Sequence, residues 1–327
     1  MTRSAALPGS ADGARRAACC AILLTLTIAA ASLRAASAAD RVREGRATLT
    51  VEWVGATADL GQSGLLDWVR RSAAIVGGYY GDFPAEMAAI RVTTVDGEHV
   101  GAGHAFGSTP PHIEISVGRH VTVDALRDDW VLVHEMIHLA LPEVGDEQNW
   151  LGEGLATYVE GIARVQAGNM SEAALWQEYL ESMPKGLPQG DDRGLDRTHS
   201  WARTYWGGAL YCLIADVRIR EQTANRKGLQ DALRAISQRA GLWTQWPVQR
   251  IFATGDTATG TTVLHDLYMQ MKDQPMAPDL GALWIDLGIR MNGGVMHFDD
   301  SARLAAVRRA ITRRAAEPSS LPSVAPQ

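Results

Sequence analysis

Apolar and polar residues alternate in the first patterned stretch of the chain, ATLTVEWV, which spans Ala47–Val54. A period of two predicts a strand that buries one face. Met87–Val95 and Pro111–Val117 are rich in apolar and β-branched residues and predict two further strands. The glycine-rich stretch between them, Gly101–Pro110, has two interpretations: a flexible turn or an accessible strand edge.

The period changes to that of a helix after the first strand, where apolar residues recur at helical spacing over Leu65–Val76. The two glycines that follow are expected to end this helix. A second helix is predicted to begin at Thr122 or Asp124, which are good N-caps. It should stop near Leu141, because Pro142 disfavours helical geometry in the residue before it.

Helical spacing dominates the rest of the chain. A helix is predicted from Asn149 to at least Ile162, and later helical stretches are Ala173–Ser182, Tyr205–Arg220, Leu229–Arg239 and Ser301–Arg314. Beyond residue 201 a strand pattern is visible only at Gly294–Phe298. The chain is therefore predicted to have an α+β fold, with a mixed α/β part over 40–182, a mainly helical part over 183–317 and a flexible tail over 318–327. A stretch rich in proline, glycine and aspartate, 183–196, is expected to join the two parts.

The N-terminus has the pattern of a signal peptide. Arg15 and Arg16 precede an uncharged apolar run, Ala17–Ala31, and small residues follow at Ala36-Ser37-Ala38. Because the run is short for a membrane-spanning helix, we expect residues 1–39 to be cleaved. The product is expected to be exported, periplasmic or extracellular, with no membrane contact after cleavage. An uncleaved membrane anchor is the alternative.

Charge and cysteine content narrow the class of protein. The formal net charge is −6 at pH 7, and loss of residues 1–39 makes it more negative because four arginines leave with one aspartate. Such an acidic protein is not expected to have nucleic acid as a main partner. Cys212 alone lies beyond the signal segment, so internal disulfides are excluded. We expect Cys212 to be a buried small apolar residue, with a reactive thiol as the alternative.

The candidate chemistry lies in an otherwise apolar stretch, VLVHEMIHLALP, which contains His134, Glu135 and His138. Residues four apart lie on one face of a helix, so the two imidazoles can bind one metal ion. Glu135 is offset by one residue and is placed beside the metal, where it can accept a proton from water. This is the spacing of the zinc-binding H-E-x-x-H signature. The alternative is that both histidines are hydrogen-bonded core residues without a metal.

A catalytic zinc site takes three protein ligands and leaves a fourth position for water. Glu153, within NWLGEGLATYVEG, offers the third ligand from a predicted helix whose apolar residues can pack against the first one. Glu143, Asp146 and Glu147 are nearer in sequence, but they follow a proline in a predicted loop and are expected to form a solvated rim. We therefore predict one Zn²⁺ ion, bound by the two histidines and Glu153.

Three motifs in order, HEMIH, WLGEGLATY and TYWGGALYCLIADVRIRE, resemble the gluzincin metallopeptidases. Within that group the chain looks like the glycyl aminopeptidase family and, more distantly, aminopeptidase N. The resemblance covers about 130–235 and continues weakly at LWIDLGIRMNGG, Leu283–Gly294. It implies a zincin (thermolysin-like) catalytic domain that hydrolyses peptide bonds with metal-activated water and with Glu135 as general base.

The same resemblance implies a role for Tyr205, which matches the tyrosine that donates a hydrogen bond to the oxyanion of the tetrahedral intermediate. An aromatic residue at the start of a core helix is the alternative interpretation of Tyr205, and His199 is an alternative donor. The Gly-x-Met-Glu-Asn motif that recognises a substrate N-terminus in the aminopeptidase N branch is absent. GAGHAFG, Gly101–Gly107, lies at roughly its place and carries no carboxylate.

We expect Gly101, Gly103 and His104 to bind substrate, because glycines leave backbone groups accessible to an extended peptide. The predicted function is that of a secreted zinc peptidase, either aminopeptidase-like or an endopeptidase. The alternative is a catalytically inactive zincin-fold binding protein of the cell envelope. Retention of Glu135 together with Tyr205 favours the enzyme.

Overall fold

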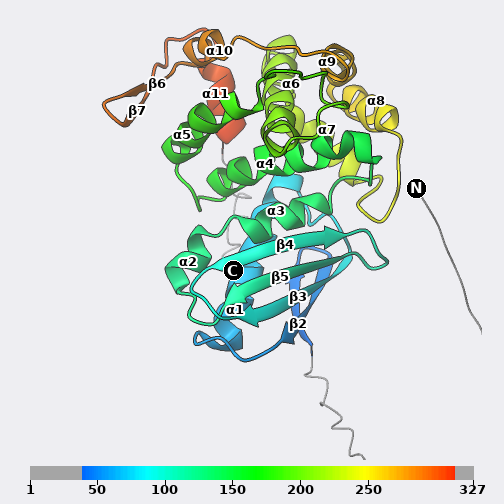
Figure 1. The fold of residues 1–327 in the computed structure, drawn as a ribbon, viewed down its shortest axis with the longest axis vertical. Helices are drawn as coiled ribbons and strands as arrows, with labels where there is room; N and C mark the ends of the chain where they lie inside the picture. The colour runs from blue at the N-terminus through cyan, green and yellow to red at the C-terminus, as the bar shows by residue number, and fades with distance from the viewer. Residues whose placement is uncertain (1–38, 314–327) are drawn as a thin grey trace, which may run out of the picture. The chain divides into compact units, whose positions relative to one another are not determined.

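A mixed five-stranded sheet forms the first part of the computed structural model, which describes residues 39–313 (Figure 1). Its strands are β1 (Asp40–Glu44), β2 (Ala47–Val54), β3 (Met87–Val95), β4 (Val100–Phe106) and β5 (His112–Gly118). They lie in the order β1-β2-β3-β5-β4; the β2–β3 and β3–β5 pairs are parallel and the two outer pairs antiparallel. Residues 1–38 of the predicted signal segment and the tail 318–327 lie outside the described residues.

The two outer strands were the least certain from sequence. Of the two interpretations of Gly101–Pro110, the structure shows the strand edge, because β4 is the outer strand beside β5. β1 was not predicted, since DRVRE has no apolar alternation; only Val42 is buried there. Its backbone pairing with β2 holds it in the sheet, and such pairing leaves no pattern in the side chains.

Helix α1 (Gly61–Tyr80) packs against the sheet and extends beyond its predicted end. Gly77 keeps helical geometry and lies against the Glu44 side chain, 3.0 Å from where a Cβ would stand. The residue that ends the helix is Gly81, at φ 87°, a left-handed conformation that glycine adopts without strain. The predicted stop at the glycine pair was therefore wrong.

The predicted single helix from Thr122 to Leu141 is two helices, α2 (Val123–Asp128) and α3 (Val131–His138). Asp129 lies between them in an extended conformation, and its carboxylate accepts hydrogen bonds from the backbone N–H of Val131 at 3.0 Å and of Leu132 at 3.2 Å. It also accepts the indole N–H of Trp68 on α1 at 2.9 Å. A side-chain cap therefore starts a new helix at this point.

The remaining elements are mostly helices. They are α4 (Asn149–Gln166), α5 (Glu172–Ser182), α6 (Gly208–Thr223), α7 (Leu229–Ser237), α8 (Val248–Thr259), α9 (Val263–Met271), α10 (Leu280–Leu287) and α11 (Ala305–Thr312), with a hairpin of β6 (Ile289–Asn292) and β7 (Val295–Phe298). The α4, α5, α6, α7 and α11 stretches were predicted. α8, α9 and α10 were not; α8 contains glycine and three threonines, which are poor helix formers.

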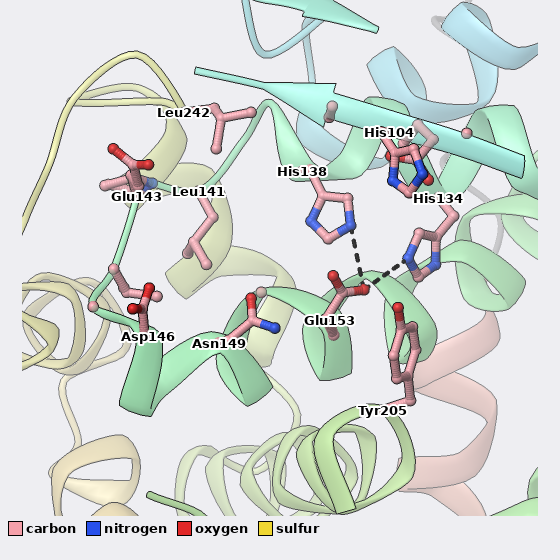
Figure 2. A pocket seen from close by; sticks show the side chains of 17 residues that line it. His104, His134, His138, Leu141, Glu143, Asp146, Asn149, Glu153, Tyr205 and Leu242 are labelled. Atoms are coloured by element: carbon pink, nitrogen blue, oxygen red, sulfur yellow. Dashed lines mark hydrogen bonds and ion pairs between the residues drawn. The ribbon is translucent and has the colours of Figure 1, made fainter. Parts of the chain in front are cut away.

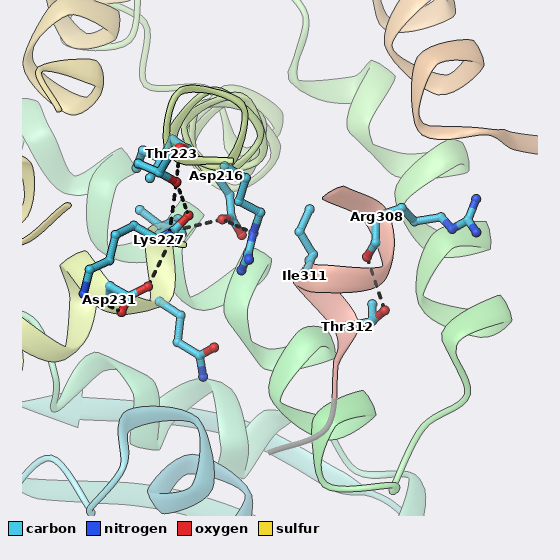
Figure 3. A network of polar contacts seen from close by, with 12 residues as sticks. Asp216, Thr223, Lys227, Asp231, Arg308, Ile311 and Thr312 are labelled. Atoms are coloured by element: carbon cyan, nitrogen blue, oxygen red, sulfur yellow. Dashed lines mark hydrogen bonds and ion pairs between the residues drawn. The ribbon is translucent and has the colours of Figure 1, made fainter. Parts of the chain in front are cut away.

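Helix α4 packs against α6 and so connects the two predicted parts of the chain. Near this contact lies the buried carboxylate of Asp216 (Figure 3). It accepts hydrogen bonds from the Tyr158 hydroxyl of α4, the Arg220 guanidinium of α6 and the Leu229 backbone N–H of α7. These bonds satisfy a charge that would otherwise be costly to bury. Cys212 lies on α6 and is buried, which confirms its expected role as a small core residue.

The stretch 183–196 contains a 3₁₀ helix, Met183–Gly186, and ends at a buried carboxylate. Asp196 accepts hydrogen bonds from the Trp150 indole at 2.8 Å, the Gln148 amide at 3.0 Å and the Tyr268 hydroxyl at 2.7 Å. It therefore fixes this stretch to the start of α4. The domain boundary at 183 stays a prediction. Within residues 39–313, no helix has the length and apolar character needed to span a bilayer.

Candidate metal centre

Helix α3 holds the two histidines of the motif one turn apart, with ring centroids 4.9 Å from each other (Figure 2). Both imidazoles are largely buried, and His134 is 4% exposed. Four other residues of α3 are apolar and fully buried: Leu132, Val133, Met136 and Ile137. Their packing in the core fixes the rotation of the helix and hence the direction in which both imidazoles point.

Glu153 on α4 faces both imidazoles. Its Oε2 lies 3.4 Å from Nε2 of His134 and 3.6 Å from Nε2 of His138. A tetrahedral zinc ion with bonds of about 2.1 Å separates neighbouring ligand atoms by about 3.4 Å. In the described part of the chain, these three residues are the one group whose ligand atoms all lie within 4.8 Å of one another. The donor set and its spacing therefore fit zinc.

The charges of the three side chains depend on each other. Burial raises the pKa of Glu153, but the hydrogen bonds and charges of the two histidines outweigh burial and hold this pKa well below its usual range. Burial lowers the pKa of His134, and Glu153 only partly opposes the shift. Burial also lowers the pKa of His138, but Glu153 and Glu135 raise it overall. An ionised carboxylate and neutral imidazoles are the forms that bind a metal. The shifts of Glu153 and His134 favour these forms, whereas the raised pKa of His138 favours a proton that a metal ion must displace.

Glu135 lies at the wall of the same cavity, between α3 and β4. It is 7% exposed; burial and the charge of Glu153 raise its pKa, while His138 and His104 oppose the shift. A Cβ on Gly103 of β4 would stand 2.7 Å from Cγ of Glu135. Glycine at 103 therefore makes room for this carboxylate. A carboxylate with a raised pKa is suited to accept a proton and pass it on.

Tyr205 lies in a π-helical turn, Arg203–Gly207, which leads into α6. Such turns are rare and are frequent at functional sites. The phenol ring stacks on the His134 ring at a centroid distance of 6.3 Å. Figure 2 shows Tyr205 next to His134 and Glu153. Burial, followed by the charge and hydrogen bond of Glu153, raises the pKa of Tyr205 to about 12. The hydroxyl therefore stays protonated and can donate a hydrogen bond.

The cavity around these side chains has a volume of about 310 Å³ and two different ends. His134 and Tyr205 lie at one end, and Glu143, Asp146 and Leu242 lie at the other (Figure 2). Both carboxylates at the second end belong to exposed residues. They lie away from the three ligand atoms, as expected for a solvated rim.

Of the other predicted site residues, some line the cavity and some do not. Gly103 and His104 line the cavity, whereas Gly101 lies against Ser116 of β5 and is not among the lining residues. His199 is exposed and outside the lining, so Tyr205 is the better placed of the two proposed oxyanion donors. Glu147 faces Arg197 at 3.8 Å and also lies outside the lining.

Some residues that line the cavity were not predicted from the sequence. Leu242 belongs to a loop more than a hundred residues after the motif, and its backbone N–H donates to the carbonyl of Leu139 just after α3. Asn149 and Gly152 line the cavity because they precede Glu153 on α4. Their proximity to Glu153 in sequence could have identified them. Nothing local points to Leu242.

The sequence matches no protein-family model and no curated protein. Solved structures similar to this chain include an aminopeptidase N family protein and M1 zinc metallopeptidases. An M1 zinc metallopeptidase from Deinococcus radiodurans, solved as a mutant bound to a Tyr-Ser-Ala substrate, shares 17% identity at a TM-score of 0.47; the match covers 74% of this chain and 52% of that one. The wild-type enzyme from the same organism shares 18% identity at a TM-score of 0.46 over the same fractions.

An aminopeptidase N family protein from Idiomarina loihiensis superposes with a TM-score of 0.55 at 13% sequence identity. The match covers 77% of this chain and 49% of the other, so this chain spans about half the length of that protein. Identity at this level is evidence for the fold alone. The chain therefore shares its mixed sheet and helical part with that aminopeptidase N family protein.

Proposed function

We propose that this protein is a zinc-dependent peptidase with a zincin (thermolysin-like) catalytic domain, resembling the glycyl aminopeptidase family. The observation that carries the proposal is the convergence of three zinc-binding side chains, His134, His138 and Glu153, with Glu135 and Tyr205 around one cavity. The fold supports a peptidase, because the solved structure that superposes with this chain at a TM-score of 0.55 is an aminopeptidase N family protein.

Zinc held by His134, His138 and Glu153 would supply a Lewis acid that polarises the scissile carbonyl and acidifies water. Glu135 accepts the proton from the attacking water and then delivers it to the leaving amine. Tyr205 donates its hydroxyl proton in a hydrogen bond to the oxygen that becomes negative, which lowers the barrier by about 3 kcal/mol for a well-placed donor. The outer strand β4, with Gly103 and His104 at the cavity, binds an extended peptide through its backbone.

The test is Glu135→Gln, which keeps the shape of the side chain and removes its basicity. Zinc content by elemental analysis should stay at one ion per chain, while hydrolysis of a peptide mixture falls by at least about 10²-fold. Glu147→Gln is the matched control, because its carboxylate lies outside the cavity and faces Arg197. A protein that binds no zinc, or a Glu135→Gln variant that keeps full hydrolysis, contradicts the proposal.

The alternative, a catalytically inactive zincin-fold binding protein, predicts zinc binding without turnover in the wild type. It gives no reason for a buried Glu135 beside the ligands or for a tyrosine held in a π-helical turn. Both are explained by the peptidase.

We also propose that the protein is exported and acts in the periplasm or outside the cell. The support is the arginine pair, apolar run and small-residue site within residues 15–38. Mass spectrometry of the protein recovered from its native compartment should find the N-terminus near residue 39 or 40. A cytoplasmic protein that retains Met1 contradicts this proposal.

A further inference from the structure

Two tryptophans next to the metal centre are exposed. Trp130 is 51% exposed and Trp201 is 62% exposed, whereas Trp68, Trp150 and Trp176 are fully buried in the core. Exposed large aromatic side chains that lie close to a functional site are a common mark of a binding surface. Neither tryptophan belongs to the zinc ligands or to the residues that line the cavity.

Each indole contacts a side chain of the site. Trp130 lies edge-on against His134, with centroids 5.7 Å apart and planes at 84°. Trp201 stacks on Tyr205, with centroids 5.6 Å apart and planes at 25°. Tyr205 in turn stacks on His134. The four rings therefore form a chain of contacts that joins the two indoles through His134 and Tyr205. Because His134 is buried, the two indoles provide the exposed surface of this chain of rings.

This surface lies at one defined end of the site. Helix α3 begins just after Trp130 and ends at His138, and the chain then reaches Leu141 and the carboxylates of Glu143 and Asp146. Strand β4 packs against α3, and the residue after the strand, Gly107, lies against the Leu242 backbone at that acidic end. A peptide extended along β4 across the metal centre therefore has the carboxylates on one side and the indoles on the other.

We propose that Trp130 and Trp201 form an indole subsite that binds a large apolar or aromatic side chain of the substrate peptide on one side of the cleaved bond. The occupant follows from the surface: indole faces and edges pack with apolar and aromatic groups. That the occupant belongs to a peptide rests on the proposed function. The subsite makes cleavage selective for the residue at one position.

The first test compares kcat/KM for peptide pairs that differ only by phenylalanine or alanine, at each position flanking the cut. The wild type should prefer phenylalanine by at least about 10-fold at one position on one side. Trp130→Ala and Trp201→Ala should each reduce this ratio at least about fivefold, mainly through KM. Trp201→Phe should retain most of the preference for phenylalanine. Trp243→Ala is the control, because Trp243 is 37% exposed but lines a separate groove with Met87 and Pro110.

If the tryptophan substitutions reduce kcat/KM equally for the phenylalanine and alanine peptides, the inference is overturned, because the indoles then act only by supporting His134 and Tyr205. An unchanged ratio in both variants overturns it as well. Self-association of the wild type that disappears in Trp130→Ala and Trp201→Ala would make the surface an interface between copies, and this also overturns it.

A second measurement separates the inference from the proposed function. Zinc-loaded Glu135→Gln protein is titrated with a fluorescently labelled phenylalanine peptide, and binding is followed by anisotropy. When Trp201→Ala is combined with Glu135→Gln, the Kd for the peptide should increase about tenfold. If this holds while the wild type cleaves no peptide, the peptidase proposal fails and the indole subsite stands. If the wild type cleaves peptides and Trp201→Ala leaves the Kd unchanged, the indole subsite fails and the peptidase proposal stands.

Discussion

A Cβ placed on Gly154 of α4 would lie 2.2 Å from the Cα of Gly208 on α6, so the two helices touch through their backbones. Gly154 directly follows the ligand Glu153, and Gly208 directly follows the π-helical turn that carries Tyr205. The contact between these glycines therefore sets how closely the third candidate ligand and Tyr205 can approach.

Gly208→Ala is expected to reduce kcat by at least about tenfold, because its Cβ would meet the Trp150 carbonyl oxygen at 2.1 Å and push α6 and Tyr205 away from Glu153. If the glycine acts through the tyrosine, the same substitution in a Tyr205→Phe background should cost little more. The measurement is a double-mutant cycle in kcat, with zinc content and thermal unfolding measured for each variant.

Gly161→Ala on α4 is the matched control, since its Cβ would meet side-chain ends of Leu175 at 2.5 Å and Met170 at 4.0 Å, and no backbone atom. This variant should keep kcat. Additive losses in the cycle would show that Gly208 supports the fold without positioning Tyr205.

The three candidate zinc ligands could be predicted because each lies in a local pattern. The His134–His138 spacing is a property of one helix, and Glu153 lies within the motif of the next. Their convergence, however, needs the packing of α3 on α4, and the approach of Tyr205 needs the contact of α4 with α6. Sequence spacing could name these residues, but their distances depend on tertiary contacts.

The break between α2 and α3 could not be predicted for a related reason. The apolar periodicity continues through Asp129, and aspartate within a helix is only mildly unfavourable. The break follows from the Asp129 carboxylate, which caps α3 and is held by the indole of Trp68, a residue 61 positions earlier in the chain. β1 is similar, because its pairing with β2 is a backbone property.

Asp129→Ala is expected to reduce the free energy of unfolding by about 2–4 kcal/mol, because it removes the cap of α3 and leaves the buried Trp68 N–H without a partner. Urea unfolding measures the change. Asp124→Ala is the control: Asp124 forms an exposed ion pair with Arg127, and its loss should cost about 0.5 kcal/mol or less. Equal costs for the two variants would contradict the role given to Asp129.

Metal removal is expected to lower the Tm without unfolding the protein. Without zinc, Glu153 still interacts with both imidazoles at 3.4 and 3.6 Å, so its charge stays compensated. Adding zinc back should raise the Tm as the logarithm of the zinc concentration increases. At a zinc concentration of a hundred times the Kd, the free energy of unfolding should increase by about 2.7 kcal/mol. His138→Ala should lose this response.

His265→Ala is the control for metal addition, because His265 is exposed on α9 and pairs with Asp266 far from the ligands in sequence. Differential scanning calorimetry with chelated and zinc-loaded protein gives the comparison. A zinc response that persists in His138→Ala would place the metal elsewhere.

Stability should fall as the pH rises from about 4.5 to about 8, because of Glu160 on α4. Burial raises the pKa of this carboxyl to about 8, against a usual value of 4.5; Arg164, 3.5 Å away, opposes the shift only in part, and Glu178 adds to it. Within this window the native state binds a proton that the unfolded state has released, so a rising pH favours unfolding. Above about 8 both states are ionised and the effect is complete.

Glu160→Gln cannot ionise, so it should match the wild type near pH 5 and exceed it near pH 8.5 by on the order of 3 kcal/mol. Urea unfolding at both pH values measures the difference. Glu98→Gln, at an exposed position, should show the same pH dependence as the wild type. If Glu160→Gln loses stability at both pH values, the Arg164 ion pair outweighs desolvation and the carboxylate is ionised in the native protein, because only an ionised group gains from a nearby guanidinium.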